Sequence, residues 1–300
     1  MTNMLLQYPV TTLDGTCLLE AGTLLDDQVL GEVAARQDEF YISQPLMQFA
    51  TVESDLAKLL SKPPYQELFL HREKISLLLE WMRAVHLAPA CLDTLVYFRQ
   101  HDYYTYRHIL MVFALTTLLA HDLLPDSQAR IREALASPIH DIGKICVPLD
   151  ILKKNTPLTR SEMSFLEHHT LAGSVLLSYY LQDSEHFAVR VARDHHERQN
   201  GSGYPRGISD LDPLVEIIIV SDIYDALVSP RPYRPVCYDN RTAIEEITRL
   251  AEDGEIGWYA VKALVAHHRH MPFVPEEIWV SSEKRGLSPP GNLYRLIIED

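Results

Sequence analysis

Hydrophobic positions recur at helical spacing along most of the chain after the first fifty or so residues. Leu56, Leu59 and Leu60 begin the pattern, and Thr159 with Glu162 three residues later forms a capping-box sequence. The pattern predicts a mainly α protein whose body is an all-helical domain of roughly 200 residues. Expected helices include LLLEWMRAVHLAPACLDTLVYF, YRHILMVFALTTLLAHDLL, SQARIREALASPIHDIGK and SEMSFLEHHTLAGSVLLSYYL, with others at 185–197, 212–228, 241–252 and 257–268.

The first part of the chain follows a different pattern. Asp14 and Gly15 lie between two short apolar or β-branched runs, which is typical of a β-hairpin. Residues 26–37 predict one short helix, and the segment EFYIS predicts another strand. We expect a small α+β module that acts as a folding cap or dimerisation element, with a ligand sensor as the alternative.

These patterns divide the chain into regions. They are the α+β module at 1–52, a helical linker at 53–98, the main helical domain at 99–285 and a C-terminal tail at 286–300. Two prolines and a glycine precede the strand-like segment LYRLII of the tail. A homodimer formed through the amino-terminal helices is a further hypothesis.

Composition and charge narrow the function classes. The four cysteines stand far apart and form no C-x-x-C pair, which favours a reducing cytosol over a disulfide scaffold. The amino terminus, MTNMLLQYPV, lacks a secretory pattern, and the apolar run HILMVFALTTLLA is too short to span a bilayer. We therefore expect a cytoplasmic protein without membrane insertion. The net charge of −14 argues against duplex nucleic acid as a partner, but a metal cluster or a few arginines can still bind one small anion.

Some of the fourteen histidines lie next to acidic residues or within apolar segments, where charged side chains are uncommon. His140 and Asp141 interrupt an apolar segment that we expect to be helical, and His195 and His196 end a helix before a glycine-rich turn. Asp222 lies in another strongly apolar run, where an unpaired carboxylate costs several kcal/mol. A shared pair of divalent cations offsets such costs, and imidazoles combined with carboxylates suit iron or manganese. The trio His267, His268 and His270, by contrast, is expected to be a solvated cluster at a helix end.

Three motifs give these residues a family context. HDIGK, HHERQNGSGYP and SDIYDALVSPRPYR occur in this order, and the chain from about residue 100 to 270 resembles the HD-GYP family. That family is a helical branch of the HD phosphohydrolase superfamily, and its members typically hydrolyse the bacterial second messenger cyclic di-GMP. The resemblance implies a helical HD-domain bundle and a metal-dependent phosphodiesterase in bacterial signalling, with linear pGpG or GMP, or both, as the product.

The resemblance also implies a ligand set for two divalent metal ions, iron or manganese. Asp141 is the expected bridge between them. Tyr104 stands where some members carry a glutamate for a third metal, so we expect two metals. The implied ligands are His108, His140, Asp141, His169, His195, His196 and Asp222.

Further roles follow from the same resemblance. Lys144 is expected to act with Asp141 in catalysis by steadying a phosphate oxygen. The turn Gly203, Tyr204 and Pro205 is expected at the mouth of the metal site, where the ring contacts substrate. The implied phosphate-binding arginines are Arg231 and Arg234, and the implied supporting acids are Glu197 and Asp225.

Departures from the family pattern keep other functions open. Gln199 and Asn200 stand where an aromatic residue and an aspartate are common, and Glu216 stands where arginine is common. One alternative is a phosphodiesterase for another cyclic dinucleotide. Another is a low-activity cyclic dinucleotide sensor, or a module that docks diguanylate cyclase proteins through its glycine loop.

Overall fold

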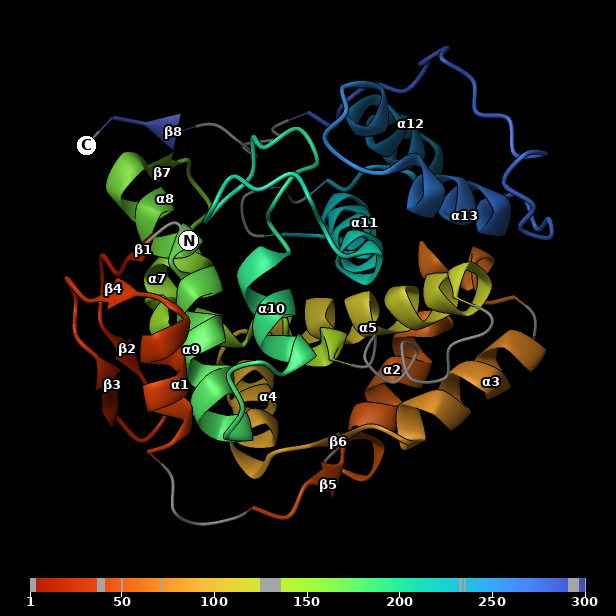
Figure 1. Cartoon of the computed structure of the whole chain (residues 1–300). Helices are drawn as coiled ribbons and strands as arrows, with labels where there is room; N and C mark the ends of the chain where they lie inside the picture. The colour runs from red at the N-terminus through yellow and green to blue at the C-terminus, as the bar shows by residue number, and fades with distance from the viewer. Residues whose placement is uncertain are drawn as a thin grey trace.

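The computed structural model describes residues 4–36, 41–49, 51–70, 72–124, 136–231, 234, 236–290 and 297–299. Within these ranges the protein is mainly α-helical, as predicted, with helices arranged around the long central helix α5 (Tyr103–Leu123) (Figure 1). The surrounding helices are α2 (Val52–Leu60), α3 (Arg72–Arg83), α4 (Pro89–His101), α7 (Leu149–Leu152), α8 (Arg160–Glu167), α9 (His169–Leu181), α10 (Phe187–Asp194), α11 (Pro213–Val228), α12 (Asn240–Glu252) and α13 (Trp258–His268).

The amino-terminal segment contains short antiparallel strands and one helix. Strands β1 (Met4–Leu5) and β4 (Leu24–Leu25) pair with each other, as do β2 (Val10–Thr11) and β3 (Cys17–Leu19). The second pair confirms the predicted hairpin, and Gly15 takes a φ of 87° in its turn. Helix α1 (Asp27–Ala34) begins at Asp26, whose side chain caps it, and packs against α9.

The strand predicted for EFYIS is wrong within the described residues. Residues 41–43 have no strand, and β5 (Gln44–Pro45) follows them and pairs with β6 (His86–Leu87). The start of that segment lies outside the described residues. In the C-terminal tail, β8 (Ile297–Ile298) pairs in parallel with β7 (Leu158–Thr159).

Helix α5 is the centre of the hydrophobic core. Nearly every residue from Thr105 to Ala120 is buried, as expected for a helix that is apolar on all sides. It packs against α3, α4, α11 and α13, and the buried cluster continues into the amino-terminal strands through Leu6 and Val10. No helix among the described residues combines the length and the apolar character needed to cross a bilayer.

Two predicted helices differ from the structure around the candidate ligands. The segment 161–181 is two helices, because the chain bends at His168 between α8 and α9, although the predicted capping box at Thr159 is present. His140 and Asp141 lie between two short 3₁₀ helices, η3 (Ser137–Ile139) and η4 (Ile142–Cys146), where the sequence predicted an α-helix. Residues 127–135 of that predicted helix lie outside the described ranges. The remaining 3₁₀ helices are η1 (Leu46–Gln48) and η2 (Tyr65–Glu67).

Candidate metal centre

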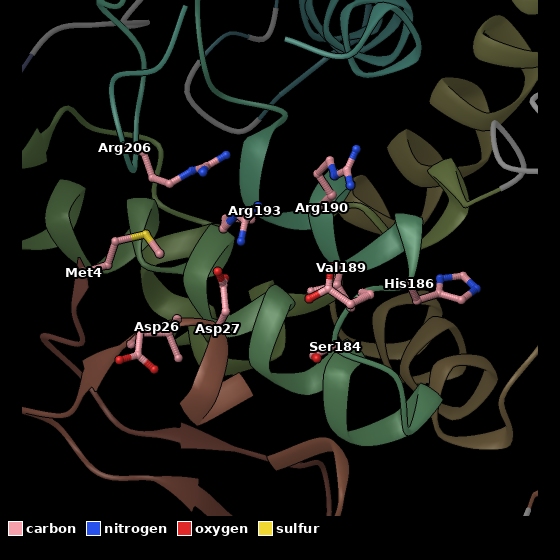
Figure 2. A pocket seen from close by; sticks show the side chains of 11 residues that line it. Met4, Asp26, Asp27, Ser184, His186, Val189, Arg190, Arg193 and Arg206 are labelled. Carbon is pink, nitrogen blue, oxygen red and sulfur yellow. The ribbon is translucent and has the colours of Figure 1, made fainter. Parts of the chain in front are cut away.

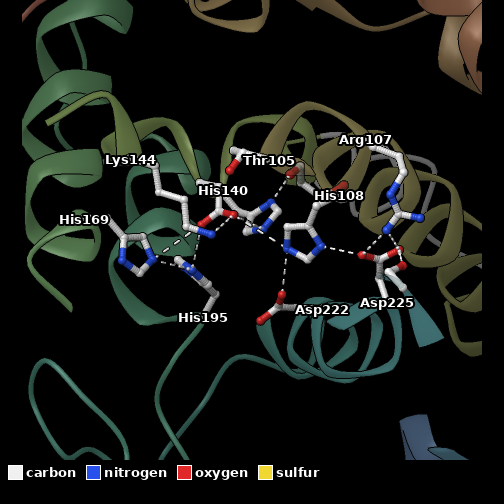
Figure 3. Close-up of polar contacts among 12 residues, drawn as sticks. Thr105, Arg107, His108, His140, Lys144, His169, His195, Asp222 and Asp225 are labelled. Carbon is white, nitrogen blue, oxygen red and sulfur yellow. Dashed lines mark hydrogen bonds and ion pairs between the residues drawn. The ribbon is translucent and has the colours of Figure 1, made fainter. Parts of the chain in front are cut away.

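Asp141 lies among buried histidines whose Nε2 atoms point toward it. The Nε2 atoms of His108 and His140 lie 3.6 and 3.5 Å from its Oδ2 atom. Those of His169 and His195 lie 3.4 and 3.7 Å from its Oδ1 atom. The two carboxylate oxygens therefore face different pairs of imidazoles, which come from opposite sides of the cluster (Figure 3).

The candidate ligand atoms fall into two groups joined by Asp141. Ligand atoms of His169, His195 and His196 all lie within 4.8 Å of one another, and those of His108, His140 and Asp222 do the same. Asp222 Oδ1 lies 2.9 Å from His108 Nε2. The structure thus brings together every ligand position that the sequence resemblance implies.

Hydrogen bonds at Nδ1 aim the other ring nitrogen of three histidines into the cluster. A backbone carbonyl oxygen can accept a hydrogen bond but cannot donate one. Each of these rings therefore carries its hydrogen on Nδ1 and, when neutral, has a lone pair on Nε2. The acceptors are the carbonyl oxygens of Ser137 for His140 (2.7 Å), Leu166 for His169 (2.6 Å), and Val191 and Ala192 for His195 (3.1 and 3.0 Å).

This arrangement of lone pairs fits cations. The Nε2 atoms of His169 and His195 are only 3.2 Å apart, and two lone pairs at that distance repel unless a cation lies between or beside them. His140 Nε2 and Asp141 Oδ1 are buried and have no hydrogen-bond partner among the described residues. Buried polar atoms without partners are costly, and metal coordination satisfies such atoms.

The charge states also suit metal binding, which requires neutral imidazoles and ionised carboxylates. Burial lowers the pKa of His140 to about 4 and that of His169 to about 3. Burial alone would raise the pKa of Asp141, but Lys144 and the nearby imidazoles outweigh it and hold the pKa well below its usual value. Burial alone would raise the pKa of Asp222, but the nearby imidazoles of His108, His196 and His140 outweigh it and hold the pKa well below its usual value.

Asp225 orients His108 from behind. Its Oδ2 atom lies 2.6 Å from His108 Nδ1, and the guanidinium of Arg107 donates to both carboxylate oxygens at 3.3 Å. The hydroxyl of Tyr65 also donates to Asp225, and Ser229 Oγ donates to it at 3.0 Å. Sequence analysis expected Asp225 to support a ligand or an arginine, but it missed Tyr65, Arg107 and Ser229. The run "YR" directly before His108 was the available signal for the arginine.

Replacing Tyr65 by phenylalanine is expected to lower the free energy of unfolding by about 1–2 kcal/mol, because the buried Asp225 carboxylate loses a hydroxyl donor. Urea denaturation of the two proteins measures this difference. The exposed Tyr259 gives a matched control, for which the same substitution should leave the free energy unchanged. Equal stability of Tyr65→Phe and the parent protein would contradict the expectation.

Lys144 and Arg231 both approach the carboxylates of the cluster. Lys144 Nζ lies 2.5 Å from Asp141 Oδ2. Arg231 Nη2 lies 3.6 Å from Asp225 Oδ2 and 2.8 Å from His108 Nδ1. The Asp225 carboxylate can only accept a hydrogen bond, so we assign the hydrogen on His108 Nδ1 to the His108–Asp225 bond. The position of Arg231 is then explained by the attraction between its positive charge and Asp225.

Arg234 lies elsewhere than the phosphate-binding prediction expects. Its side chain is buried, and Nη2 donates to the carbonyl oxygens of Ala226, Leu227 (3.1 Å) and Ser229 (3.4 Å). The guanidinium therefore caps the carboxyl end of α11, where unpaired carbonyls attract cations. In this structure Arg234 stabilises the helix that carries Asp222 and Asp225 rather than facing the ligand cluster.

Gly143 sets the distance between η4 and α9. A Cβ atom added there would lie 1.9 Å from the carbonyl oxygen of His169 and 2.4 Å from the backbone nitrogen of Gly173. No larger residue fits so close to a neighbouring backbone. The absence of a side chain at Gly143 allows the segment that carries Asp141 to lie directly against the start of the helix that carries His169.

Glu197 holds the glycine-rich loop beside the candidate ligands His195 and His196. Its Oε1 atom accepts a hydrogen bond from the backbone nitrogen of Arg206 at 2.7 Å, and Oε2 accepts one from Ile208 at 3.0 Å. A Cβ atom at Gly203 would lie 2.4 Å from the Glu197 Cα atom. Only glycine at position 203 therefore lets the loop lie so close to the backbone of Glu197. The acid expected to play a supporting part thus contacts the loop.

The loop brings Tyr204 to the edge of the cluster. The Tyr204 ring stacks on His196 with centroids 4.7 Å apart and an interplanar angle of 14°, and its backbone nitrogen donates to the His196 carbonyl at 3.2 Å. The peptide bond to Pro205 is cis. Tyr204 is partly exposed at the edge of the cluster, and its place at the mouth of a substrate site stays a prediction.

The substituted residues near this loop contact each other. Gln199 Nε2 donates to Glu216 Oε1, and the backbone nitrogen of Gln199 donates to the Glu255 carbonyl at 2.9 Å. A Cβ atom at Gly257 would lie 2.7 Å from Glu216 Oε2, so that glycine makes room for the pair. Two departures from the family pattern are therefore one local contact between the loop and α11.

A separate polar cavity of about 200 Å³ lies between α1 and α10 (Figure 2). Arg193 and Arg206 line it, and both donate to Asp194, at 3.0 and 2.7 Å. Asp27 of α1 points into the same space. Asp194 is the last residue of α10, so the cavity borders the end of the helix that leads directly to the candidate ligands His195 and His196.

The histidines outside the cluster are not all solvated. His267 was expected in a solvated group, but it is 2% exposed and its Nε2 atom lies 3.1 Å from Asp122 Oδ2. His168, which was expected to be no ligand, is absent from the groups of candidate ligand atoms among the described residues and packs edge-on against Tyr8. Burial lowers the pKa of His168 to about 4.

His168 should therefore make stability depend on pH. The folded protein keeps this ring neutral, while the unfolded chain protonates it below about pH 6.5, so stability is lost as the pH falls from there toward 4. Between pH 7 and pH 5 the loss from this residue is about 2 kcal/mol. Urea denaturation of metal-free protein and of His168→Asn at both pH values tests this. A pH dependence that is the same in both proteins would contradict it.

The comparisons with known proteins agree with this centre. Residues 91–257 match the family model described as HD domain, and this range contains the three motifs and every candidate ligand. The chain therefore belongs to the HD domain family. That result confirms the resemblance to the HD phosphohydrolases, and the HDIGK and GSGYP motifs identify the HD-GYP branch.

Curated relatives carry more specific names. A cyclic di-GMP phosphodiesterase of Pseudomonas aeruginosa is 40% identical over 168 residues, which are 55% of this chain and 39% of that protein. A cyclic di-GMP phosphodiesterase of Thermotoga maritima is 36% identical over 153 residues, 50% of this chain and 40% of that one. The 3'3'-cGAMP-specific phosphodiesterase 3 of Vibrio cholerae is 36% identical over 165 residues, 54% and 35% respectively. The matched region thus spans well under half the length of these relatives.

Proposed function

We propose that this protein is a metal-dependent phosphodiesterase that hydrolyses cyclic di-GMP in bacterial second-messenger signalling, with linear pGpG or GMP, or both, as the product. The observation that carries the proposal is the position of Asp141, whose two oxygens face two separate groups of nitrogen and oxygen ligands. Relatives named as cyclic di-GMP phosphodiesterases support the choice of substrate.

Two divalent cations held in these groups would supply a nucleophilic water at neutral pH and would withdraw charge from the phosphate. Asp141 would hold both cations, and Asp225 would keep His108 in its binding orientation. Lys144 borders the same carboxylate and is only partly buried, so its ammonium is available to a phosphate oxygen. Arg231 supplies a second positive charge beside His108, and Tyr204 borders the entrance. Iron or manganese suits this mixture of imidazole and carboxylate.

A second candidate substrate has specific support. One relative is named as specific for 3'3'-cGAMP, so a phosphodiesterase acting on that dinucleotide would keep the same metal centre. The third reading, a sensor or docking module with little hydrolysis, rested on the altered loop residues. The mutual contact of Gln199 and Glu216 accounts for two of these changes as a structural pair outside the ligand cluster, which favours the enzyme.

Product analysis separates these functions. Purified protein loaded with manganese or iron should convert cyclic di-GMP to pGpG or GMP, and chromatography identifies the products. The same assay is run in parallel with 3'3'-cGAMP and with cyclic di-AMP as the substrate. Faster turnover of 3'3'-cGAMP would favour the second candidate. Binding of cyclic di-GMP without any product, in protein that contains both metals, would contradict the proposed hydrolase. A cytoplasmic location, a homodimer and docking of diguanylate cyclases stay predictions.

A further inference from the structure

An open cavity of about 530 Å³ lies beside the first turn of α5. The side chains of Tyr103 and Tyr104 form one part of its wall, and Lys153, Asn155 and Gln100 contribute polar groups. Its size falls within the range of small-molecule sites in proteins, which is about 300–1,000 Å³. None of these five residues belongs to the candidate metal centre.

The cavity is bordered by two segments that lead directly to metal ligands. Tyr104 precedes His108 by one helical turn, so the two side chains share a face of α5. On the other side, Lys153 directly follows α7, which the chain reaches from Asp141 through η4. A molecule bound in the cavity would therefore lie next to the candidate centre without occupying it.

The wall offers exposed aromatic surface, although the Tyr103 ring also contacts Tyr106. The Tyr103 and Tyr104 side chains are 51% and 41% exposed, although both stand on a helix that is otherwise buried almost throughout. An exposed ring is a platform for a nucleobase, and stacking of a base on an aromatic side chain contributes about 1–3 kcal/mol.

The polar groups that line the cavity together with the rings are available for hydrogen bonds. The side chains of Gln100, Lys153 and Asn155 are exposed and form no hydrogen bond or ion pair with any other described residue. The Lys153 ammonium is a donor only, whereas the amides of Asn155 and Gln100 both donate and accept. Guanine presents two adjacent acceptors, O6 and N7, while adenine presents a donor beside N7. The ammonium therefore favours guanine over adenine.

We propose that this cavity is a guanine-binding subsite, in which Tyr104 stacks on the base and Lys153 donates to its O6 and N7 edge. The inference rests on the proposed function, because it assumes a guanine-containing phosphodiester held at the adjacent metals. It assigns base selectivity to residues of α5 and of the segment after α7, outside the three family motifs.

Steady-state kinetics and binding test the stacking role of Tyr104. Tyr104→Ala should raise the KM for cyclic di-GMP and the Kd for GMP, measured by calorimetry, about tenfold or more, while kcat changes less than about twofold. Tyr104→Phe should keep parent values, because the phenyl ring still stacks. Tyr259→Ala, which removes an equally exposed tyrosine from α13, should change neither quantity. An unchanged KM and Kd in folded Tyr104→Ala would overturn the subsite.

A second variant tests which base the cavity prefers, and its substitution lies outside helix α5. Lys153→Met should raise the KM for cyclic di-GMP severalfold more than that for cyclic di-AMP, and equal effects would overturn the guanine assignment. Hydrolysis of bis(p-nitrophenyl) phosphate, which has no purine, should be the same in all these variants. Should the parent protein hydrolyse only that substrate, the proposed function fails, whereas the Kd for GMP still decides whether the subsite exists.

Discussion

Replacing Asp141 by asparagine is expected to abolish tight binding of both metal ions and to lower hydrolysis of cyclic di-GMP by about a thousandfold or more. Each oxygen of Asp141 faces a different group of ligands, and the neutral amide retains only one acceptor oxygen. Losing the cations removes several kcal/mol of transition-state stabilisation, and each 1.36 kcal/mol corresponds to a factor of ten in rate. Elemental analysis of the purified protein gives the metal content, and chromatography gives the rate.

Asp150→Asn provides the matched control, because it makes the same chemical change at an exposed position on α7. It should retain about two metal ions per chain and the parent rate. Circular dichroism checks that both variants fold. Full metal content in folded Asp141→Asn would show that the carboxylate does not bridge two cations, and the proposed mechanism would then be wrong.

Replacing Gly143 by alanine is expected to lower the free energy of unfolding by about 3 kcal/mol, at the upper end of the usual cost of overpacking. The added methyl group would meet the backbone of His169 and Gly173, which cannot move aside as a flexible side chain can. To relieve the clash, η4 must shift away from α9, which separates Asp141 from His169. The same substitution should therefore also reduce metal occupancy.

Thermal unfolding and elemental analysis measure the two effects of Gly143→Ala. The matched control is Gly31→Ala within α1, where the nearest atom, Ser184 Oγ, lies 4.0 Å from the added Cβ. Alanine has the higher helix propensity, so this control should be neutral or stabilising by up to about 1 kcal/mol. Comparable melting temperatures for both variants would contradict the proposed close approach at Gly143.

The sequence pattern predicted the mainly α-helical fold, and the family resemblance supplied candidate ligands that the structure brings close together. Regular apolar periodicity predicted α11 to α13 to within one residue at either end, whereas α10 is shorter than the predicted helix 185–197 and ends at Asp194. The local chain path at His140 and at His168 was not predictable in the same way. There the backbone departs from an α-helix, and tertiary packing, including the contact of Gly143 with α9, decides the local geometry.

Most of the residues that orient the candidate ligands were also beyond sequence patterns, although Asp225 was expected in a supporting role. Tyr65 and Asp225 are 160 positions apart, so no spacing rule connects them, yet their side chains meet behind His108. The carbonyl groups that fix three histidine rings are backbone atoms and carry no sequence signal at all. Arg234 is a case in which the sequence motif predicted a role that the structure does not show. Its guanidinium donates to carbonyl groups at the end of α11 instead of facing the ligand cluster.

The two hydrogen bonds from the glycine-rich loop to Glu197 have a consequence for the rate of encounter with substrate. Because Arg206 and Ile208 fix the loop, the loop would lose little conformational entropy on binding the substrate that we propose. Association should then proceed without a slow rearrangement at the entrance. Substrate selectivity would then depend on how well the substrate fits the preformed loop, rather than on a rearrangement of the loop around the substrate.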